Sequence, residues 1–412
     1  MKILIINTAE RKGGAAVACN RLHEALVANG YDSKMLVREK SSNDASVYVF
    51  SESIIRKKIN LAFFFIELFI LRFFKKKGYD FSLPWFGPDL SKHTLVQEAD
   101  IIHLHWVQNS FVTLRTIKKL EALNKPIVWT LHDMWAFTGG CHYNGTCRKF
   151  EKQCESCPQL KNNSIVDFSK VTFKEKLNTY SSKIQIVTPS KWLSSEAKSS
   201  KLFSNNTITT IPYNIDFNLF KPTDKKTARK KFNLNINKKI ILFVSMNVED
   251  ERKGFKWFKE AILKLENEVP NWINNYEILA IGRSSGEKHF NTKIHYTGRL
   301  SNIEMISAAY SAADVFIAPS EQDNLPNTVI ESLACGTPVV AFNIGGMPDM
   351  IEHKKNGYLA DFANIDELSS GLLFCISTPL NQIVRETAMH KFNEQMVVSE
   401  YAKLYNDIAK NN

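Results

Sequence analysis

The stretch that most constrains the fold of this chain runs from Asp314 to Pro348. It opens with the apolar run Val315–Ala318, passes through a polar loop, and closes with a second apolar run, Val339–Phe342. Pro326 lies between the runs and suits the first turn of a helix, because its missing N–H would have no partner there. The stretch therefore predicts a strand–helix–strand unit of a parallel sheet, and ligands in such folds bind at the carboxyl ends of the strands.

Two carboxylates accompany the predicted helix, which we expect to start near Leu325 and to stop at Gly336. Asp323 lies in the loop before the helix and Glu331 inside it, with seven residues between them. Both can reach one ligand at the positive N-terminal end of the helix, where an anion is favoured. The alternative is that Asp323 only caps the helix and Glu331 is solvated.

The segment P-S-x-x-D-N-L-P-N-T-V-I-E-S-L-A-C-G-T-P-V-V-A resembles the C-terminal signature of the retaining, GT-B fold glycosyltransferases of family 4. That family usually carries two glutamates seven residues apart; Glu331 matches the second and Asp323 replaces the first. The resemblance implies that the first acid holds donor-sugar hydroxyls and the second the nucleotide ribose. It also implies donor contacts near the start of the helix, from Asn324, Leu325, Asn327 and Thr328.

Length and charge limit the classes of function. A chain of 412 residues favours two domains of roughly 150–200 residues each. The net charge of +11 favours an anionic partner, and without a recognised nucleic-acid motif we place a nucleoside diphosphate and anionic lipid above nucleic acid. Met1-Lys2 leads directly into a buried-strand pattern rather than a secretory signal, so we expect a cytoplasmic protein.

The expected fold is α/β, with two Rossmann-like parallel-sheet domains that face each other across a cleft, as the GT-B resemblance implies. We assign residues 1–212 to an acceptor-side N-terminal domain and 221–395 to a domain that binds the donor nucleotide sugar. Residues 213–220 have extended character between prolines and form the expected hinge. By the resemblance, a C-terminal helix, 396–412, crosses back to the first domain.

The N-terminal domain offers two candidate donor contacts. Strand Ile3–Ile6 leads into Gly13-Gly14 and a helix pattern, so the backbone there can approach a ligand, although a plain tight turn also explains the pair. Strand Pro126–Leu131 ends in His132, which the resemblance implies hydrogen-bonds the donor sugar. A structural role for this histidine is the alternative.

Residues 54–77 form the most hydrophobic window, bracketed by R-K-K and K-K-K. Its apolar part, Ile59–Phe74, has 16 residues, or about 24 Å of helix, which is short of the ~30 Å bilayer core, and Glu67 and Arg72 interrupt it. We expect a helix in the interface of an anionic inner-leaflet membrane rather than a spanning helix. Burial within the N-terminal domain is the alternative.

Four cysteines cluster with the spacing C-x5-C-x6-C-x2-C, within residues 141–157. Disulfides are unfavourable in a reducing cytosol, so thiols gathered in one loop favour a closed, structural zinc site. The spacing is irregular, and free or partly redox-active thiols are the alternative. The candidate zinc ligands are Cys141, Cys147, Cys154 and Cys157.

The second half restarts with strand Ile240–Val244 and a basic loop before the next helix. Arg252 and Lys253 with Gly254 suit a diphosphate, whose negative charge grows as the glycosidic bond breaks. The family resemblance implies a diphosphate clamp here, although the usual arginine five residues before Lys253 is Val248, so Arg252 takes its expected role. A solvated basic loop is the alternative.

Two further glycine positions resemble the family's base-binding loops, namely Gly282-Arg283 and Gly298. Gly345-Gly346 fits the turn beside the donor sugar. The sequence therefore predicts a nucleotide-sugar site whose residues come mainly from the second domain.

The resulting prediction is a retaining, hexosyltransferase-type enzyme of surface polysaccharide synthesis. It would move a sugar from a UDP or GDP donor to a hydroxyl of a lipid-linked glycan, on the inner face of the membrane, without a catalytic cofactor and without nucleic acid. The alternatives are a GT-B nucleotide-sugar epimerase and a catalytically inactive, membrane-docked nucleotide-sugar-binding protein.

Overall fold

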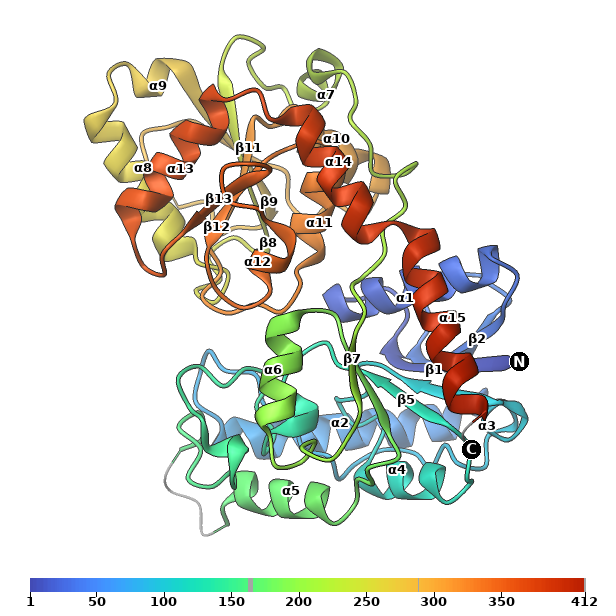
Figure 1. Cartoon of the computed structure of the whole chain (residues 1–412). Coiled ribbons are helices and arrows are strands. Elements are labelled where there is room, and N and C mark those ends of the chain that lie inside the picture. The colour runs from blue at the N-terminus through green and yellow to red at the C-terminus, as the bar shows by residue number, and fades with distance from the viewer. Residues whose placement is uncertain (162–165, 288, 411–412) are drawn as a thin grey trace. The chain divides into compact units, whose positions relative to one another are not determined.

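A computed structural model describes residues 1–161, 166–287 and 289–410. The chain divides into two compact units, one of Met1–Tyr213 with Gln395–Asn412 and the other of Asn214–Glu394. Each unit holds a parallel sheet, and Figure 1 shows helices around each sheet. The predicted α/β fold with two parallel-sheet domains is therefore confirmed.

The strands of the first unit pair in the order β3-β2-β1-β4-β5-β6-β7. They are β1 (Lys2–Ala9), β2 (Asp32–Glu39), β3 (Val47–Val49), β4 (Ile101–Leu104), β5 (Ile127–Thr130), β6 (Gln185–Thr188) and β7 (Ile208–Thr210). The helices are α1 (Gly14–Ala28), α2 (Ile54–Phe74), α3 (Thr94–Glu98), α4 (Leu114–Glu121), α5 (Phe168–Leu177), α6 (Lys191–Ser199) and α15 (Glu394–Lys410), with short 3-10 turns η1 (Trp135–Phe137) and η2 (Lys149–Glu151).

Apolar side chains cover both faces of this sheet. Helices α1 and α15 pack on one face, and α3, α4, α5 and α6 contribute to the core of the other. Helix α15 is also bound to the sheet by polar groups, because His103 Nδ1 lies 2.7 Å from the Tyr405 hydroxyl and Thr130 Oγ1 lies 3.0 Å from the Tyr401 hydroxyl. Burial, with a smaller effect of His132, lowers the pKa of His103 to about 3, so this ring is a neutral structural group.

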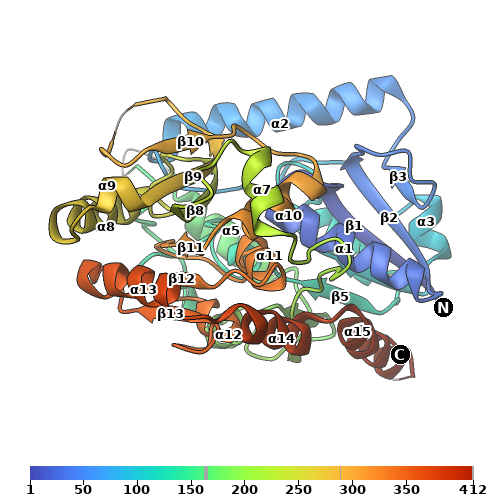
Figure 2. The same ribbon diagram turned by 90° about the horizontal axis from the view of Figure 1, so that it is seen from above.

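Helix α2, the long helix at the upper edge of Figure 2, has an inverted distribution of polarity. Its buried residues are Asn60, Glu67 and Leu71. Most of its large apolar side chains are exposed; Phe69, for example, is 64% exposed. The exposed apolar residues of α2 are Ile54, Ile55, Ile59, Leu61, Phe65, Ile66, Leu68, Phe69 and Phe73. The alternative of a helix buried by its apolar side chains is therefore not what the structure shows.

Polar groups attach α2 to the first unit. Asn60 Nδ2 donates to the carbonyl of Ser110 at 2.6 Å. Glu67 accepts from the backbone N–H of Leu83 at 2.9 Å and from the Ser110 hydroxyl at 2.5 Å. Burial raises the pKa of Glu67 despite these donors. Across the described residues, no helix is long and apolar enough to cross a membrane.

The strands of the second unit pair in the order β10-β9-β8-β11-β12-β13. They are β8 (Lys239–Asn247), β9 (Tyr276–Arg283), β10 (Ile294–Tyr296), β11 (Val315–Ala318), β12 (Val339–Phe342) and β13 (Gly357–Ala360). The helices are α7 (Lys225–Lys231), α8 (Phe255–Glu268), α9 (Trp272–Asn275), α10 (Ile303–Ala312), α11 (Asn327–Ala334), α12 (Met347–Met350), α13 (Ile365–Ser377) and α14 (Asn381–Phe392).

The element that was predicted from Asp314–Pro348 is present as β11, α11 and β12. Helix α11 begins at Asn327 rather than near Leu325, because Pro326 has the extended backbone of an N-cap residue. The helix ends at Ala334, and Gly336 follows in the left-handed region with φ 77°. The first strand is also longer than expected, since β1 runs on to Ala9.

Candidate functional site

In both sheets, strands are added first on one side of the unit's first strand and then on its other side. The strand order therefore reverses beside that first strand. In the first unit this point lies between β1 and β4, and in the second between β8 and β11. Loops at the carboxyl ends of two such strands diverge and leave a crevice where nucleotides bind in related folds. The predicted site residues follow these strands in each of the two units.

In the second unit the basic loop after β8 lies directly against the end of β11. A Cβ atom at Gly254 would stand 1.7 Å from the carbonyl oxygen of Pro319, and the residue has φ 81°. The backbone N–H of Glu321 donates to the carbonyl of Arg252 at 3.0 Å. Only glycine permits this approach, which brings the Arg252-Lys253 pair to the loop that carries Asp323.

Arg252, Lys253 and Asp323 form one charged cluster. Lys253 Nζ lies 2.6 Å from Asp323 Oδ2, and Arg252 Nη1 lies 4.0 Å from the same oxygen. Burial alone would raise the pKa of Asp323, but the two cations outweigh it and lower that pKa below its usual value. The sequence placed these residues at one site but did not predict that they pair with each other.

The turn after β12 packs against the loop that carries Asp323. Gly345 has φ 54°, and a Cβ atom there would stand 2.0 Å from the Asp323 carbonyl oxygen. Gly346 donates its N–H to that oxygen at 3.3 Å. The N–H of Asn324 donates to Asp323 Oδ1 at 3.1 Å, and Leu325 is buried. These contacts fix the direction of the carboxylate.

Glu331 lies on α11, one turn beyond the first-turn residues Asn327 and Thr328. It is 8% exposed, and its Oε2 accepts a hydrogen bond of 3.0 Å from the Tyr310 hydroxyl on α10. Sequence reasoning missed Tyr310, which lies 21 residues earlier and belongs to no recognised motif.

The predicted base-binding residues gather around the end of β9. Gly282 and Gly298 form an isolated bridge, with a 3.0 Å bond from the Gly282 N–H to the Gly298 carbonyl. A Cβ atom at Gly282 would stand 2.0 Å from the carbonyl oxygen of Ser245. The carbonyl of Arg283 accepts from the N–H of Val248 at 2.8 Å, and Val248 is buried.

In the first unit, Gly13 and Gly14 mark the start of α1. Gly13 is the N-cap with φ 95°, and no atom lies within 4 Å of where its Cβ would be. The backbone conformation, rather than close packing, is therefore what favours glycine at this position.

His132 follows β5 and is held from both ring nitrogens. Its Nε2 lies 3.0 Å from His105 Nδ1, and its Nδ1 lies 2.7 Å from the Tyr213 hydroxyl. The Tyr213 ring is stacked on the imidazole with a centroid distance of 5.5 Å. Burial lowers the pKa of His132 to about 4, against an opposing effect of Asp133, so the imidazole is neutral near pH 7.

Asp133, the residue after His132, is the centre of a second hydrogen-bonded group. Asp133 Oδ2 accepts from Trp106 Nε1 at 2.8 Å and lies 2.7 Å from His142 Nδ1. Burial opposes ionisation of Asp133, but His142 outweighs it and lowers the pKa of Asp133. Sequence reasoning missed the pairing of Asp133 with His142, because the position of His142 next to Cys141 gives no signal of it.

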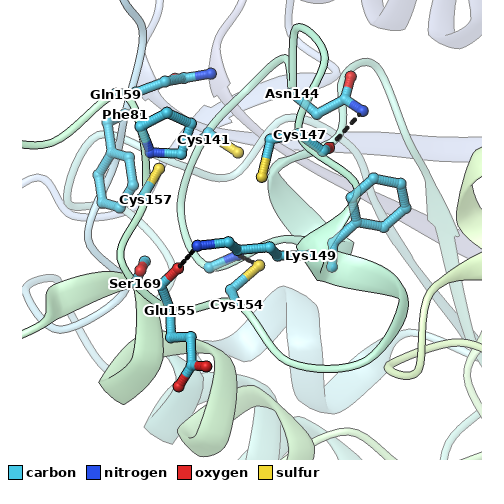
Figure 3. Close-up of a pocket in the computed structure, with 13 residues that line it drawn as sticks. Phe81, Cys141, Asn144, Cys147, Lys149, Cys154, Glu155, Cys157, Gln159 and Ser169 are labelled. Carbon is cyan, nitrogen blue, oxygen red and sulfur yellow. Dashed lines mark hydrogen bonds between the residues drawn. The ribbon is translucent and has the colours of Figure 1, made fainter.

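The four candidate zinc ligands lie close together, because all of them line one small cavity. The cavity has a volume of about 20 Å³, and Figure 3 shows the sulfur atoms of Cys141, Cys147, Cys154 and Cys157 around it. None of the four forms a disulfide. In residues 1–161, 166–287 and 289–410, no group of three or more His, Cys, Asp or Glu side chains is arranged so that it could hold a metal ion.

Two family models match this chain. The model described as "Glycosyltransferase Family 4" matches residues 12–218, which is half of the chain. The model described as "Glycosyl transferases group 1" matches residues 238–378.

Two curated relatives illustrate the sequence similarity. An "Uncharacterized glycosyltransferase" of Haemophilus influenzae is 32% identical over 139 residues, which cover 31% of this chain and 37% of the relative. An N,N'-diacetylbacillosaminyl-diphospho-undecaprenol alpha-1,3-N-acetylgalactosaminyltransferase of Campylobacter jejuni is 26% identical over 47% of this chain and 52% of its own length. The chain thus spans between about a third and a half of the length of these relatives.

Solved structures share the fold over the whole chain. Sucrose-phosphate synthase of Thermosynechococcus elongatus superposes with a TM-score of 0.66 at 17% identity and covers 100% of both chains. An Anabaena protein in complex with UDP-glucose has a TM-score of 0.62 at 15% identity, covering 99% of this chain and 100% of the other. At these identities the similarity concerns the fold, which is of the GT-B type.

Proposed function

The chain belongs to glycosyltransferase family 4, and from this premise we propose that it transfers a hexose-type sugar from a nucleoside diphosphate donor to a hydroxyl of a glycan acceptor. The observation that carries the proposal is the charged cluster of Arg252, Lys253 and Asp323 at the reversal point of the second sheet. The cluster supports the proposal because its two cations suit a diphosphate and its carboxylate can accept hydrogen bonds from sugar hydroxyls.

The donor is a UDP or GDP sugar in this proposal. Arg252 and Lys253, with the positive end of α11, stabilise the charge that develops on the departing diphosphate. Glu331 accepts from the ribose hydroxyls, and the Tyr310 hydrogen bond fixes its orientation. In this proposal the base binds beside Gly282, Arg283 and Gly298, which lie together at the end of β9.

Transfer occurs with retention of the anomeric configuration. We assign a front-face attack, in which the leaving phosphate takes the proton of the acceptor hydroxyl while the new glycosidic bond forms. His132 is neutral near pH 7, so it contributes no charge. It can hydrogen-bond a sugar hydroxyl once one of its ring nitrogens exchanges its present partner, His105 or Tyr213, for the sugar. Trapping of a covalent glycosyl-enzyme adduct would contradict this mechanism.

A binding screen against UDP and GDP sugars tests the donor proposal. We expect one donor to bind, and we expect Glu331→Ala to weaken that binding at least tenfold, while the exposed Glu260→Ala on α8 has no effect. Unchanged affinity in Glu331→Ala would contradict the assignment. With an acceptor present, an epimerised free sugar would indicate an epimerase, and binding without turnover would indicate an inactive sensor.

The acceptor in this proposal is a lipid-linked glycan that the enzyme meets at an anionic membrane surface. Helix α2 supports this, because its polar residues Asn60 and Glu67 face the protein while its apolar residues face outwards. The basic groups before and after the apolar stretch, Arg56–Lys58 and Lys75–Lys77, suit acidic headgroups. The C. jejuni relative, whose name includes a diphospho-undecaprenol group, supports such an acceptor.

Vesicle flotation tests the membrane proposal. We expect the chain to float with vesicles that contain anionic lipid, and to remain unbound after Phe65→Ser with Phe69→Ser. Phe362→Ser, on an equally large side chain that is 52% exposed in the second unit, is the matched control and should still bind. A wild-type chain that does not float, or a double variant that floats equally well, would contradict docking through α2.

A further inference from the structure

The cysteine loop is the most unusual part of the first unit that the proposed sugar transfer does not use. It follows η1 and reaches Leu160 with only η2 as regular structure. We propose that Cys141, Cys147, Cys154 and Cys157 bind one zinc ion, which closes this loop as a structural crosslink. As the four S–Zn bonds form, the four thiol protons pass to solvent.

The thiols come from separate parts of the loop and converge on one space. All four line the cavity of about 20 Å³, and Figure 3 shows their sulfur atoms turned towards it. Four sulfur donors without an open position are the ligand set of a structural zinc site. The remaining cysteines, Cys19, Cys335 and Cys375, do not line this cavity.

A backbone donor already points at the sulfur atom of Cys154. The N–H of Gly139 donates to Cys154 Sγ at 3.2 Å. A Cβ atom at Gly139 would stand 2.7 Å from Cys154 Cβ, so only glycine allows this approach. In the turn after Cys157, the N–H of Leu160 donates to the Cys157 carbonyl at 3.0 Å. A donor such as the Gly139 N–H stabilises a thiolate and orients it around a metal.

Positive charge accompanies the thiols as well. A zinc ion with four thiolates carries a net charge of about −2, which needs nearby cations or hydrogen-bond donors. Lys149 lines the cavity and donates to the carbonyl of Glu155 at 3.0 Å. Lys176 is fully buried and donates to the carbonyls of Trp135 and Thr138. Burial lowers the pKa of Lys176 to about 7, and Cys154 and Cys141 oppose this shift. An anionic metal cluster would offset the cost of burying its charge.

Metal binding requires the thiols to move closer together than in the conformation described. No described group is arranged to hold an ion as it stands, whereas zinc–sulfur bonds are about 2.3 Å long. Cys141 and Cys157 both line the cavity, with their sulfur atoms turned towards it (Figure 3). Side-chain rotation of Cys147 and Cys154 towards this pair would complete a tetrahedral set.

The loop is fastened to the end of α2, so the ion would also steady that helix. Lys75 and Leu160 form a bridge, and the N–H of Lys76 donates to the carbonyl of Gln159 at 2.9 Å. Cys141 itself bridges to Phe81. Loss of zinc should therefore loosen residues 70–83 before it affects the second unit.

Metal analysis of the full chain, purified under reducing conditions with zinc in the medium, tests the proposal. We expect about one zinc per chain in the wild type and in Cys375→Ser, and at most a small fraction in Cys147→Ser or Cys154→Ser. A wild-type chain without zinc, or equal zinc in all four proteins, would overturn the proposal. Two disulfides among these cysteines in intact-mass measurements would also overturn it.

Cobalt substitution keeps the test valid if the cysteine variants fail to fold. The wild-type chain loaded with Co²⁺ should show thiolate-to-cobalt charge-transfer bands together with the strong visible bands of a tetrahedral site. Octahedral cobalt spectra without thiolate bands would contradict the assignment. Hydrogen exchange should be faster in residues 70–83 after the metal is removed. Because neither measurement uses a nucleotide sugar, failure here is distinct from failure of the proposed transferase activity.

Discussion

The ion pair between Lys253 and Asp323 gives the sharpest quantitative prediction. Lys253→Met removes the cation that lies 2.6 Å from a carboxylate whose side chain is 9% exposed. Removing one partner of a buried pair costs about 3–5 kcal/mol, because the other charge stays buried, whereas an exposed pair is worth about 0–1 kcal/mol. Lys253 is 25% exposed and Arg252 stays within 4.0 Å, so we expect an intermediate loss of about 2 kcal/mol.

The comparison with Asp323→Asn separates this pair from other effects. That change leaves Lys253 able to reach water, so it should cost only about 1 kcal/mol. The free energy of unfolding that the double variant loses should be smaller than the sum of the two single losses by about 1 kcal/mol. The reason is that neither partner of the pair remains buried with an unpaired charge. Calorimetry of the transition assigned to residues 214–394 measures these differences, with the exposed Lys226→Met as control. A loss of about 2 kcal/mol lowers the midpoint by about 4–8 °C in a unit of this size.

The pH dependence supplies the refuting result. The pKa of Asp323 is lowered from 3.8, so the stability that its ionised form contributes is present above 3.8 and is lost as the pH falls through the folded-state pKa. The cost of Lys253→Met should therefore be largest near pH 7 and should shrink below about pH 4. An equal cost at both pH values, or strictly additive single changes, would refute the role given to this pair.

Three further predictions follow from single contacts. Tyr310→Phe removes the 3.0 Å hydrogen bond to Glu331, and calorimetric titration should show a donor dissociation constant raised by about threefold to tenfold; an unchanged constant would mean that Glu331 needs no orientation. Tyr405→Phe removes the bond to His103, and denaturant unfolding should show the first unit destabilised by about 1 kcal/mol with donor binding intact. Because the pKa of His132 is about 4, donor affinity should show no step between pH 8 and pH 5.5 from this group, and in that range a step that disappears in His132→Gln would contradict the neutral imidazole.

Features that depend on neighbouring residues in the chain were predicted well. The apolar runs around residues 315–318 and 339–342 form strands as expected, and Gly336 has the left-handed conformation that ends a helix. These positions could be predicted because local sequence determines strand pattern and backbone conformation.

Features that depend on distant residues could not be predicted. The Lys253–Asp323 pair joins residues 70 apart, and the Tyr310–Glu331 bond joins different helices. The sequence also did not determine which side of α2 faces the protein, because apolar residues occur nearly all round that segment. Two buried polar residues, Asn60 and Glu67, decide it by hydrogen bonding to backbone and hydroxyl groups that the sequence does not bring near them.

Time-resolved NMR of donor turnover tests the central claim, retaining sugar transfer by a family 4 enzyme, most directly. The purified chain is supplied with the nucleotide sugar that binds in the screen and with a glycan acceptor, and the anomeric signal of the first product is followed. The proposed mechanism predicts a product with the same anomeric configuration as the donor, formed at a rate that falls sharply in Glu331→Ala and not in Glu260→Ala. A product of inverted configuration, or turnover that Glu331→Ala leaves unchanged, would contradict it.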